Sequence, residues 1–172
     1  MELLFATSNV NKVREIQSLL PEGFVLKGLN NIGFTGDIPE TADTIAGNSQ
    51  LKADFIAQKF GIPCFSEDTG LEISALGGKP GVRTARYAGD NACNQDNISL
   101  VLQQMNGETN RSARFITVIT FFDGKTFQQV EGICEGSIAN EQKGKDGFGY
   151  DPIFIPEGDT QTFAEMDLSE KN

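Results

Sequence analysis

With 172 residues, the chain has the length of one domain with a sizeable core. Its formal net charge of −10 argues against binding to nucleic acid polymers, and the lack of a long apolar run argues against a membrane-spanning protein. Histidine is absent from the sequence, so any acid–base or metal chemistry must use carboxylates.

The first half of the chain predicts short strands that alternate with amphipathic helices. Short apolar runs next to turn or capping residues predict strands at residues 3–6, 24–26, 63–66 and 71–76. Apolar residues at helical spacing predict helices at 9–20 and 43–60, the second beginning at Asp43 or Thr44. Polar or glycine- and proline-rich segments at 30–41 and 77–81 are expected to be connections.

The second half of the chain adds a predicted β-hairpin. Residues 113–122 give the strongest strand signal, and Asp123-Gly124 forms a turn that pairs this strand with 126–138. The other expected elements are a helix at 94–105, a loop at 140–150, a strand at 152–155 and a helix beginning at 163–164. Because βαβ-like and hairpin elements occur together, the predicted fold class is α/β with a mixed sheet flanked by helices.

The segment Thr7-Ser8-Asn9-Val10-Asn11-Lys12 connects the first strand to the first helix. Thr7, Ser8 and Asn9 are residue types that cap a helix, and a helix N-terminus is a favourable place for a phosphate. Lys12 brings a positive charge to the end where the helix dipole does not favour one, so a bound polyphosphate would explain it. The alternative is that the segment only caps the helix, since it lacks the P-loop and dinucleotide-binding glycine patterns.

Two carboxylates and one lysine are further candidates for a ligand site. Glu40 lies in a polar connection, and Asp68 follows the end of a predicted strand, where open α/β sheets bind ligands. Together the two could hold Mg²⁺, which prefers oxygen ligands, although either could be a solvated turn residue. Asn48 and Lys52 share one face of the second helix, where Lys52 on its own is best explained as solvated.

The segment from Gly147 to Pro152 is unusual in composition. Phe148 lies between two glycines, so its ring has little local packing and could stack on a planar base. The alternative is an aromatic side chain that anchors a turn. Pro152 keeps Asp151 out of the helical conformation and thereby fixes the direction of its carboxylate.

Together these segments resemble the inosine triphosphate pyrophosphatase family, which removes non-canonical purine nucleotides. The resemblance covers the chain from Leu4 to Lys171, and the joint order and spacing of the motifs are specific although each motif alone is weak. The motifs are Thr7-Ser8-Asn9-Val10-Asn11-Lys12, Glu40, Asn48 with Lys52-Ala53, Ser66-Glu67-Asp68-Thr69-Gly70-Leu71, Pro80-Gly81-Val82, Ala85-Arg86-Tyr87-Ala88-Gly89 and Phe148-Gly149-Tyr150-Asp151-Pro152-Ile153-Phe154.

The resemblance implies Mg²⁺-dependent hydrolysis of the α–β phosphate bond of ITP, dITP and XTP, which gives the monophosphate and pyrophosphate. It implies one nucleoside triphosphate pyrophosphatase domain over residues 1–172, an elongated two-lobed fold with a central active-site cleft, and usually a homodimer. The family pattern continues past Asn172 into a Ser-His-Arg segment that reads the base, so this tail is expected to be missing from the sequence.

The phosphate and metal roles carry over by position. The segment from Thr7 to Lys12 would cradle the triphosphate, and Lys52 would add a second phosphate contact. Glu40 and Asp68 would hold Mg²⁺. Asp68 would also serve as the general base for the attacking water.

The nucleoside roles fall in the second half of the chain. Phe148 would stack on the purine, Asp151 would place the nucleoside, and Lys171 would contact the base. A lysine facing a 6-keto oxygen would accept inosine and xanthine and leave adenine mispaired. The expected substrate contacts here are Thr69, Phe148, Gly149, Tyr150, Asp151 and Lys171.

Three other functions stay open on the sequence. One is a nucleotide-binding protein without turnover, and another is a Maf-like nucleotide pyrophosphatase with a different base preference. The third is a glycoside hydrolase that uses Glu40 and Asp68 as paired carboxylates.

The cysteines and the N-terminus bear on the compartment. Cys64, Cys93 and Cys134 are odd in number and widely spaced, which indicates reduced thiols rather than a disulfide framework or a zinc site. The first residues show no signal-peptide pattern. We therefore expect a cytoplasmic protein.

Overall fold

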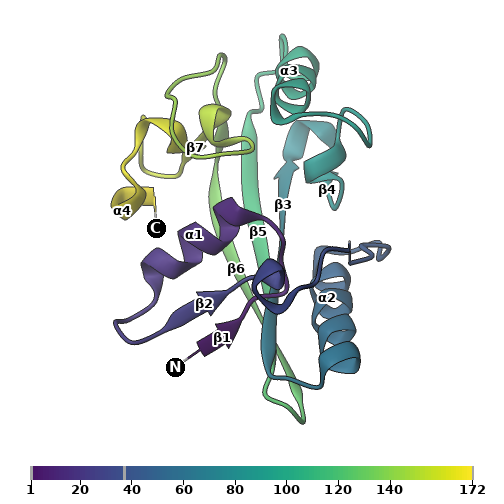
Figure 1. The fold of residues 1–172 in the computed structure, drawn as a ribbon. Coiled ribbons are helices and arrows are strands. Elements are labelled where there is room, and N and C mark those ends of the chain that lie inside the picture. The colour runs from purple at the N-terminus through teal and green to yellow at the C-terminus, as the bar shows by residue number, and fades with distance from the viewer. Residues whose placement is uncertain (1, 37, 172) are drawn as a thin grey trace. The chain divides into compact units, whose positions relative to one another are not determined.

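A computed structural model describes residues 2–36 and 38–171 of the chain (Figure 1). They form a mixed α/β fold with one sheet of two parallel strands and one of five antiparallel strands, which confirms the predicted class. The chain divides into two compact units. The first unit comprises Met1–Asp68 and Thr117–Gly132, and the second comprises Thr69–Ile116 and Ile133–Asn172.

The first unit begins with a strand–helix–strand element. Strands β1 (Glu2–Leu4) and β2 (Val25–Lys27) pair in parallel, and helix α1 (Val10–Leu19) connects them. Figure 1 shows α1 running beside β2. Val13 and Ile16 of the helix pack against Phe5 and Leu26, because they fall on its apolar face. The side chain of Gln17 joins helix to strand, since its Oε1 accepts a 2.7 Å hydrogen bond from the Leu26 amide.

Helix α2 (Ile45–Phe60) and strand β3 (Cys64–Ile73) follow. The helix begins where predicted, because Thr44 is its N-cap and accepts a 3.0 Å hydrogen bond from the Gly47 amide. Phe65 of β3 forms a parallel bridge with Phe5, and their rings stack with centroids 4.5 Å apart. These contacts place the C-terminal end of β1, and with it the segment that leads into α1, next to β3 in the first unit.

The five-stranded sheet has the order β4-β3-β5-β6-β7. Its remaining strands are β4 (Lys79–Gly81), β5 (Ser112–Phe122), β6 (Phe127–Ile138) and β7 (Phe154–Pro156). The predicted hairpin between β5 and β6 is confirmed, since Asp123 Oδ1 accepts 2.7 Å hydrogen bonds from the amides of Lys125 and Thr126. Strands β3, β5 and β6 each contribute residues to both units.

The second unit has its own apolar core. Helix α3 (Asn94–Gln104) buries Ile98 and Val101 against Leu71 and Ile73 of β3 and against Phe154 of β7. Short 3₁₀ helices at Ser74–Leu76, Thr84–Arg86, Asp151–Ile153 and Phe163–Glu165, and helix α4 (Leu168–Lys171), complete this unit. A further 3₁₀ helix, Leu29–Ile32, lies in the first unit.

Several predicted boundaries are wrong. Residues 67–70 do not follow a strand but lie in the middle of β3, because the polar side chains that suggested a turn have charged partners in the fold. That strand ends at Ile73 instead of residue 76, and part of the predicted loop at 77–81 pairs with it as β4. The predicted strand at 152–155 begins as a 3₁₀ helix, and the helix expected from 163 is a single 3₁₀ turn.

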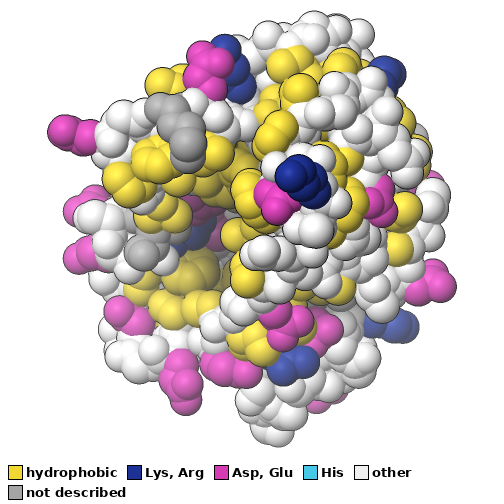
Figure 2. All heavy atoms as spheres, turned by 90° about the horizontal axis from the view of Figure 1, so that it is seen from below, with side chains coloured by type: hydrophobic (Ala, Val, Ile, Leu, Met, Phe, Trp, Pro, Cys, Tyr) yellow, Lys and Arg dark blue, Asp and Glu magenta, His cyan; other side chains and the backbone are white. Residues whose placement is uncertain are grey.

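The surface reflects the acidic composition. Figure 2 shows acidic side chains spread around one face, with fewer lysines and arginines, in keeping with 24 acidic and 14 basic residues in the sequence. Within residues 2–36 and 38–171, no helix is long and apolar enough to cross a membrane.

Candidate functional site

The start of α1 is capped by its own preceding residues. Asn9 is the N-cap, and its Oδ1 accepts hydrogen bonds from the amides of Asn11 at 3.0 Å and Lys12 at 3.4 Å. Thr7 Oγ1 accepts a 3.1 Å hydrogen bond from the Asn9 amide. The predicted cap is therefore confirmed, and capping explains why Thr7 and Asn9 stand at these positions without any need for a ligand. Ser8, Val10 and Asn11 are exposed.

Lys12 has a carboxylate partner inside the fold. Its Nζ lies 2.7 Å from Oε2 of Glu67, whose side chain is only 6% exposed, whereas that of Lys12 is 22% exposed. An ion pair with a buried carboxylate offsets the unfavourable position of a cation near a helix N-terminus. Glu67 had no role assigned from the sequence, and its carboxylate pairs with the lysine of the expected phosphate cradle.

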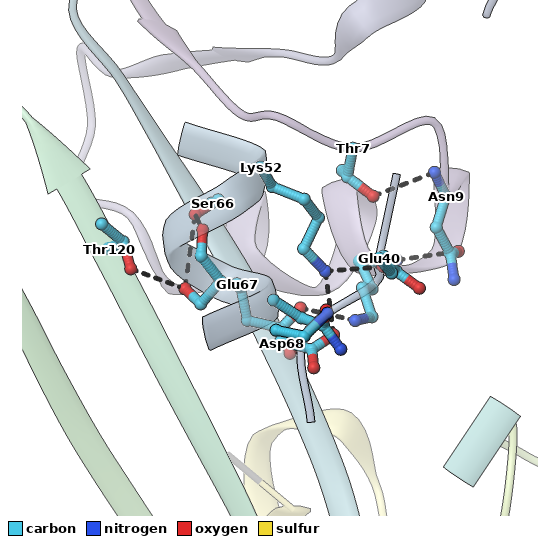
Figure 3. A network of polar contacts seen from close by, with 12 residues as sticks. Thr7, Asn9, Glu40, Lys52, Ser66, Glu67, Asp68 and Thr120 are labelled. Atoms are coloured by element: carbon cyan, nitrogen blue, oxygen red, sulfur yellow. Dashed lines mark hydrogen bonds and ion pairs between the residues drawn. The ribbon is translucent and has the colours of Figure 1, made fainter. Parts of the chain in front are cut away.

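Lys52 is buried and bridges two carboxylates (Figure 3). Its Nζ lies 2.8 Å from Glu40 Oε1 and 2.8 Å from Asp68 Oδ1, so the expectation of a solvated lysine is wrong. Burial by itself lowers the pKa of Lys52, but the charges of Asp68 and Glu40 outweigh it and raise that pKa above the ordinary value. The lysine therefore stays charged, and it joins residues from the loop before α2, from α2 and from β3.

The pKa of the Asp68 carboxyl is shifted as well. Burial raises its pKa above the ordinary value, while the Lys52 ammonium opposes this shift. The charge of Glu40 raises the pKa further, and that of Lys12 lowers it. A carboxylate whose pKa is moved toward neutrality is a better proton acceptor than an ordinary aspartate, as a general base requires.

A buried group of hydroxyls fixes α2 against the sheet beneath these charges. Ser49 Oγ lies 2.8 Å from Thr120 Oγ1, and Ser66 Oγ donates a 2.6 Å hydrogen bond to the Ser49 carbonyl. All three residues are fully buried, and Figure 3 shows Ser66 and Thr120 of this group. Because Ser66 lies two residues before Asp68, these hydrogen bonds hold α2 and β3 in the arrangement that pairs Lys52 with Asp68.

Asn48 holds the segment that carries Glu40. It is buried on α2, and its Oδ1 accepts a 2.9 Å hydrogen bond from the Ala42 amide, two residues beyond Glu40. Asn48 and Lys52 lie on one face of α2 and both contact this loop. Asn48 accepts a hydrogen bond from its backbone, and Lys52 forms an ion pair with Glu40.

The second unit brings together another set of predicted residues. Asp151 is buried, and its Oδ2 accepts 2.9 Å hydrogen bonds from the Phe148 amide and from Lys171 Nζ. The Lys171 ammonium also lies 5.0 Å from the centre of the Phe148 ring. Tyr150 is buried and its hydroxyl donates a 2.8 Å hydrogen bond to the Thr84 carbonyl. Gly149 beside it is half-buried.

The predicted residues thus fall into two sets. The first set lies in the first unit, where Lys12 pairs with Glu67 and Lys52 pairs with both Glu40 and Asp68. Phe148, Asp151 and Lys171 form a connected set in the second unit, to which the half-buried Thr69 also belongs by its place in the chain.

The sequence matches the model of the Ham1 family over residues 3–172. The chain belongs to the Ham1 family. The dITP/XTP pyrophosphatase of Flavobacterium johnsoniae is 50% identical over 173 residues, with 100% of this chain and 90% of that protein covered. The dITP/XTP pyrophosphatase of Bacillus subtilis is 42% identical over 175 residues, which covers 99% of this chain and 88% of that protein. The resemblance expected from the motifs is confirmed.

Solved structures of Ham1 proteins share the fold. A HAM1 protein from Coxiella burnetii superposes with a TM-score of 0.89 at 37% identity, over 100% of this chain and 90% of that one. The Staphylococcus aureus Ham1 protein gives a TM-score of 0.87 at 31% identity, over 99% of this chain and 89% of that one.

Five contributors to the site in this Ham1 protein had no role assigned from the sequence. Glu67 was not recognised because it lies in a segment that resembles a turn. Two successive acidic residues, Glu67 and Asp68, between apolar runs could have suggested buried charges. Nothing local in the sequence marks the hydroxyls, because their partners come from distant elements, and Asn48 was placed beside Lys52 without its contact to the loop. These residues are Asn48, Ser49, Ser66, Glu67 and Thr120.

Proposed function

We propose that this protein is a nucleoside triphosphate pyrophosphatase that hydrolyses ITP, dITP and XTP at the α–β bond to the monophosphate and pyrophosphate. The observation that carries the proposal is the buried bridge of Lys52 to Glu40 and Asp68. It joins a carboxylate with a raised pKa to a permanent cation, in a chain whose relatives are named dITP/XTP pyrophosphatases.

The lysines are proposed to bind the triphosphate. Lys12 and Lys52 come from α1 and α2, and both point their ammonium groups at carboxylates of β3. Phosphoryl transfer depends mainly on positioning and on neutralisation of charge, which two fixed ammonium groups provide. The exposed residues Ser8, Val10 and Asn11 next to Lys12 are proposed to complete the cradle.

Glu40 and Asp68 are proposed to hold Mg²⁺. The described residues contain no cluster of three or more acidic, cysteine or histidine side chains suited to a metal. Two carboxylates nevertheless fit Mg²⁺, which is usually bound by one or two of them together with waters and substrate phosphates. When bound, Mg²⁺ supplies neutralisation of the charge on phosphate oxygens.

Asp68 is proposed to be the general base. Its carboxylate accepts a proton from water as the water oxygen attacks the α-phosphorus, and the bond from that phosphorus to the bridging oxygen breaks. The electrons of that bond leave with pyrophosphate. Lys52 stabilises the ionised form of Asp68 before the transfer, because its ammonium lies 2.8 Å from Oδ1.

The second set is proposed to recognise the nucleoside. Phe148 is half-buried and offers a ring for stacking on the purine, with its amide fixed by Asp151. Lys171 is proposed to contact the 6-keto oxygen, and Asp151 holds the Lys171 ammonium. Thr69, Gly149 and Tyr150 are proposed as neighbouring substrate contacts.

A homodimer is also proposed. Four large apolar side chains of the β5–β6 hairpin are exposed, namely Phe121 at 38%, Phe127 at 39%, Val130 at 63% and Ile133 at 49%. Exposed large apolar side chains on one hairpin offer a surface for contact with another protein. Light scattering after size-exclusion chromatography tests this, and Val130→Glu is expected to shift a dimer toward monomer. The cytoplasmic location is likewise a prediction.

The proposed function is tested by measuring pyrophosphate release from ITP, XTP, dITP, ATP and GTP, with Mg²⁺ and with EDTA. We expect release that depends on Mg²⁺ and is confined to the first three substrates. Equal release from all five would leave the chemistry in place and reject the base selection. If none of the five releases pyrophosphate, the protein binds nucleotides without turnover or does not act on them.

A further inference from the structure

Glu67 is a buried carboxylate beside the proposed base. It lies in the middle of β3 between Ser66 and Asp68, and its side chain is only 6% exposed. A carboxylate removed from water in this way is costly unless it is paired. Its Oε2 lies 2.7 Å from Lys12 Nζ, so the pair links β3 to the first turn of α1 (Figure 3 shows Glu67 next to Asp68).

This pair determines where the Lys12 ammonium lies. The lysine stem has four rotatable bonds, and the helix dipole at this end repels a cation instead of holding it. Glu67 supplies the opposing charge and confines the ammonium to the surface of β3. The ammonium is thus held at the residue that directly precedes Asp68, the proposed base, in β3.

We infer that Glu67 is a positioning residue of the phosphate site, acting through Lys12. It holds the ammonium where the triphosphate is proposed to bind, so substrate binding does not have to order a free lysine side chain. This inference rests on the proposed function, and it goes beyond it by assigning a role to a carboxylate that the proposed function leaves without one.

The test is a double-mutant cycle with Glu67→Ala, Lys12→Ala and the double variant. The readouts are KM and kcat for ITP and the Kd for inorganic pyrophosphate measured by calorimetry. We expect Glu67→Ala to raise KM and Kd about tenfold with a smaller change in kcat, because a misplaced cation weakens binding. In the Lys12→Ala background, the same substitution is expected to change KM and Kd by less than about twofold, since Glu67 acts through Lys12.

Two further variants separate positioning from a structural role. Glu67→Gln keeps a hydrogen-bond acceptor for Lys12 and is expected to restore part of the affinity that Glu67→Ala loses. Glu72→Ala removes another ion pair of β3, with Arg114, away from this group, so it controls for the loss of an ion pair from the strand. Glu72→Ala is expected to leave KM and Kd unchanged.

The outcomes are distinct. Additive effects of Glu67→Ala and Lys12→Ala, or an unchanged KM and Kd in Glu67→Ala, would overturn the inference. If Glu67→Ala does not fold, an unchanged KM and Kd in Glu67→Gln overturns it instead. A protein that binds pyrophosphate with the expected coupling but hydrolyses no ITP would keep this inference and reject the proposed function. A protein that does neither would reject both.

Discussion

The Lys52 ammonium of α2 lies 2.8 Å from Asp68 Oδ1 of β3, with both residues buried. The relationship has two effects, because it keeps Lys52 charged inside the fold and keeps the pKa of Asp68 lower than burial alone would set it. An aspartate held in this way is favoured in its ionised form by Lys52, although burial raises its pKa.

Asp68→Asn is expected to lower kcat for ITP by at least about 100-fold, because an amide cannot accept the proton of water. The fold is expected to persist, since Lys52 keeps its ion pair with Glu40. Steady-state kinetics and circular dichroism check both statements. Asp54→Asn, which alters a partner of Gln50 on α2, is the matched control and should retain activity. Near-normal turnover in Asp68→Asn would exclude its proposed role.

The two partners of Asp68 are expected to move its pKa in opposite directions. Lys52 lowers this pKa, so Lys52→Met should raise it and shift ionisation of the carboxyl to higher pH. Glu40 raises the pKa, so Glu40→Gln should lower it. A carbon-13 NMR titration of aspartate carboxyls in the metal-free protein measures both shifts. Shifts of the same sign in the two variants would contradict the assigned electrostatics.

Phe148→Ala is expected to raise KM for ITP more than it lowers kcat. Loss of one base–aromatic stack weakens binding by about 1–3 kcal/mol, or roughly 5- to 150-fold in affinity. The Lys171–Asp151 ion pair should survive, because it does not depend on the ring. Phe148→Tyr keeps a ring and serves as the control. An unchanged KM in Phe148→Ala would reject stacking on the base.

Gly147→Ala is expected to destabilise the protein more than Gly149→Ala. Both glycines have positive φ, +77° at Gly147 and +58° at Gly149, so each substitution strains the backbone by about 1–2 kcal/mol. At Gly147 the added Cβ would also lie 2.1 Å from Asp151 Oδ2, whereas at Gly149 nothing lies within 4 Å. Thermal unfolding of the two variants measures the difference. Equal Tm values would show that the Asp151 side chain can move away from the added Cβ without loss of stability.

The three thiols are expected to differ in reactivity. Cys93 is exposed, whereas burial raises the pKa of Cys64 to about 11. Because the thiolate is the reactive form, Cys93 should be alkylated first, and Cys64 should react only on unfolding. The raised pKa of Cys64 also stabilises the fold below pH 9, its unfolded value, and this contribution is lost as the pH rises toward 11. Mass spectrometry after timed alkylation identifies the modified residues.

Local signals in the sequence predicted some parts of the structure well. Thr44 and Asn9 cap their helices as expected, because capping depends on residues within one turn. The hairpin at Asp123-Gly124 is likewise a local feature. The helix predicted at 9–20 packs on the core through Val13 and Ile16, but its apolar residues Val10 and Leu19 are 58% and 55% exposed.

The continuous course of β3 could not be predicted from the same kind of signal. Glu67 and Asp68 are residues that disfavour strands and burial, and only lysines from α1 and α2 make their position favourable. The family resemblance named Asp68 and Lys52 as site residues. It did not indicate that they pair directly, since that depends on contacts between distant elements.

The ion pairs of the first unit have a consequence for how fast a substrate arrives. Two lysines face three carboxylates there, so the group carries one net negative charge in a protein whose formal charge is −10. A free triphosphate therefore approaches against a repulsive field, and added salt screens that repulsion and speeds the encounter. A triphosphate already complexed with a divalent cation carries less charge, so its association rate depends less on ionic strength.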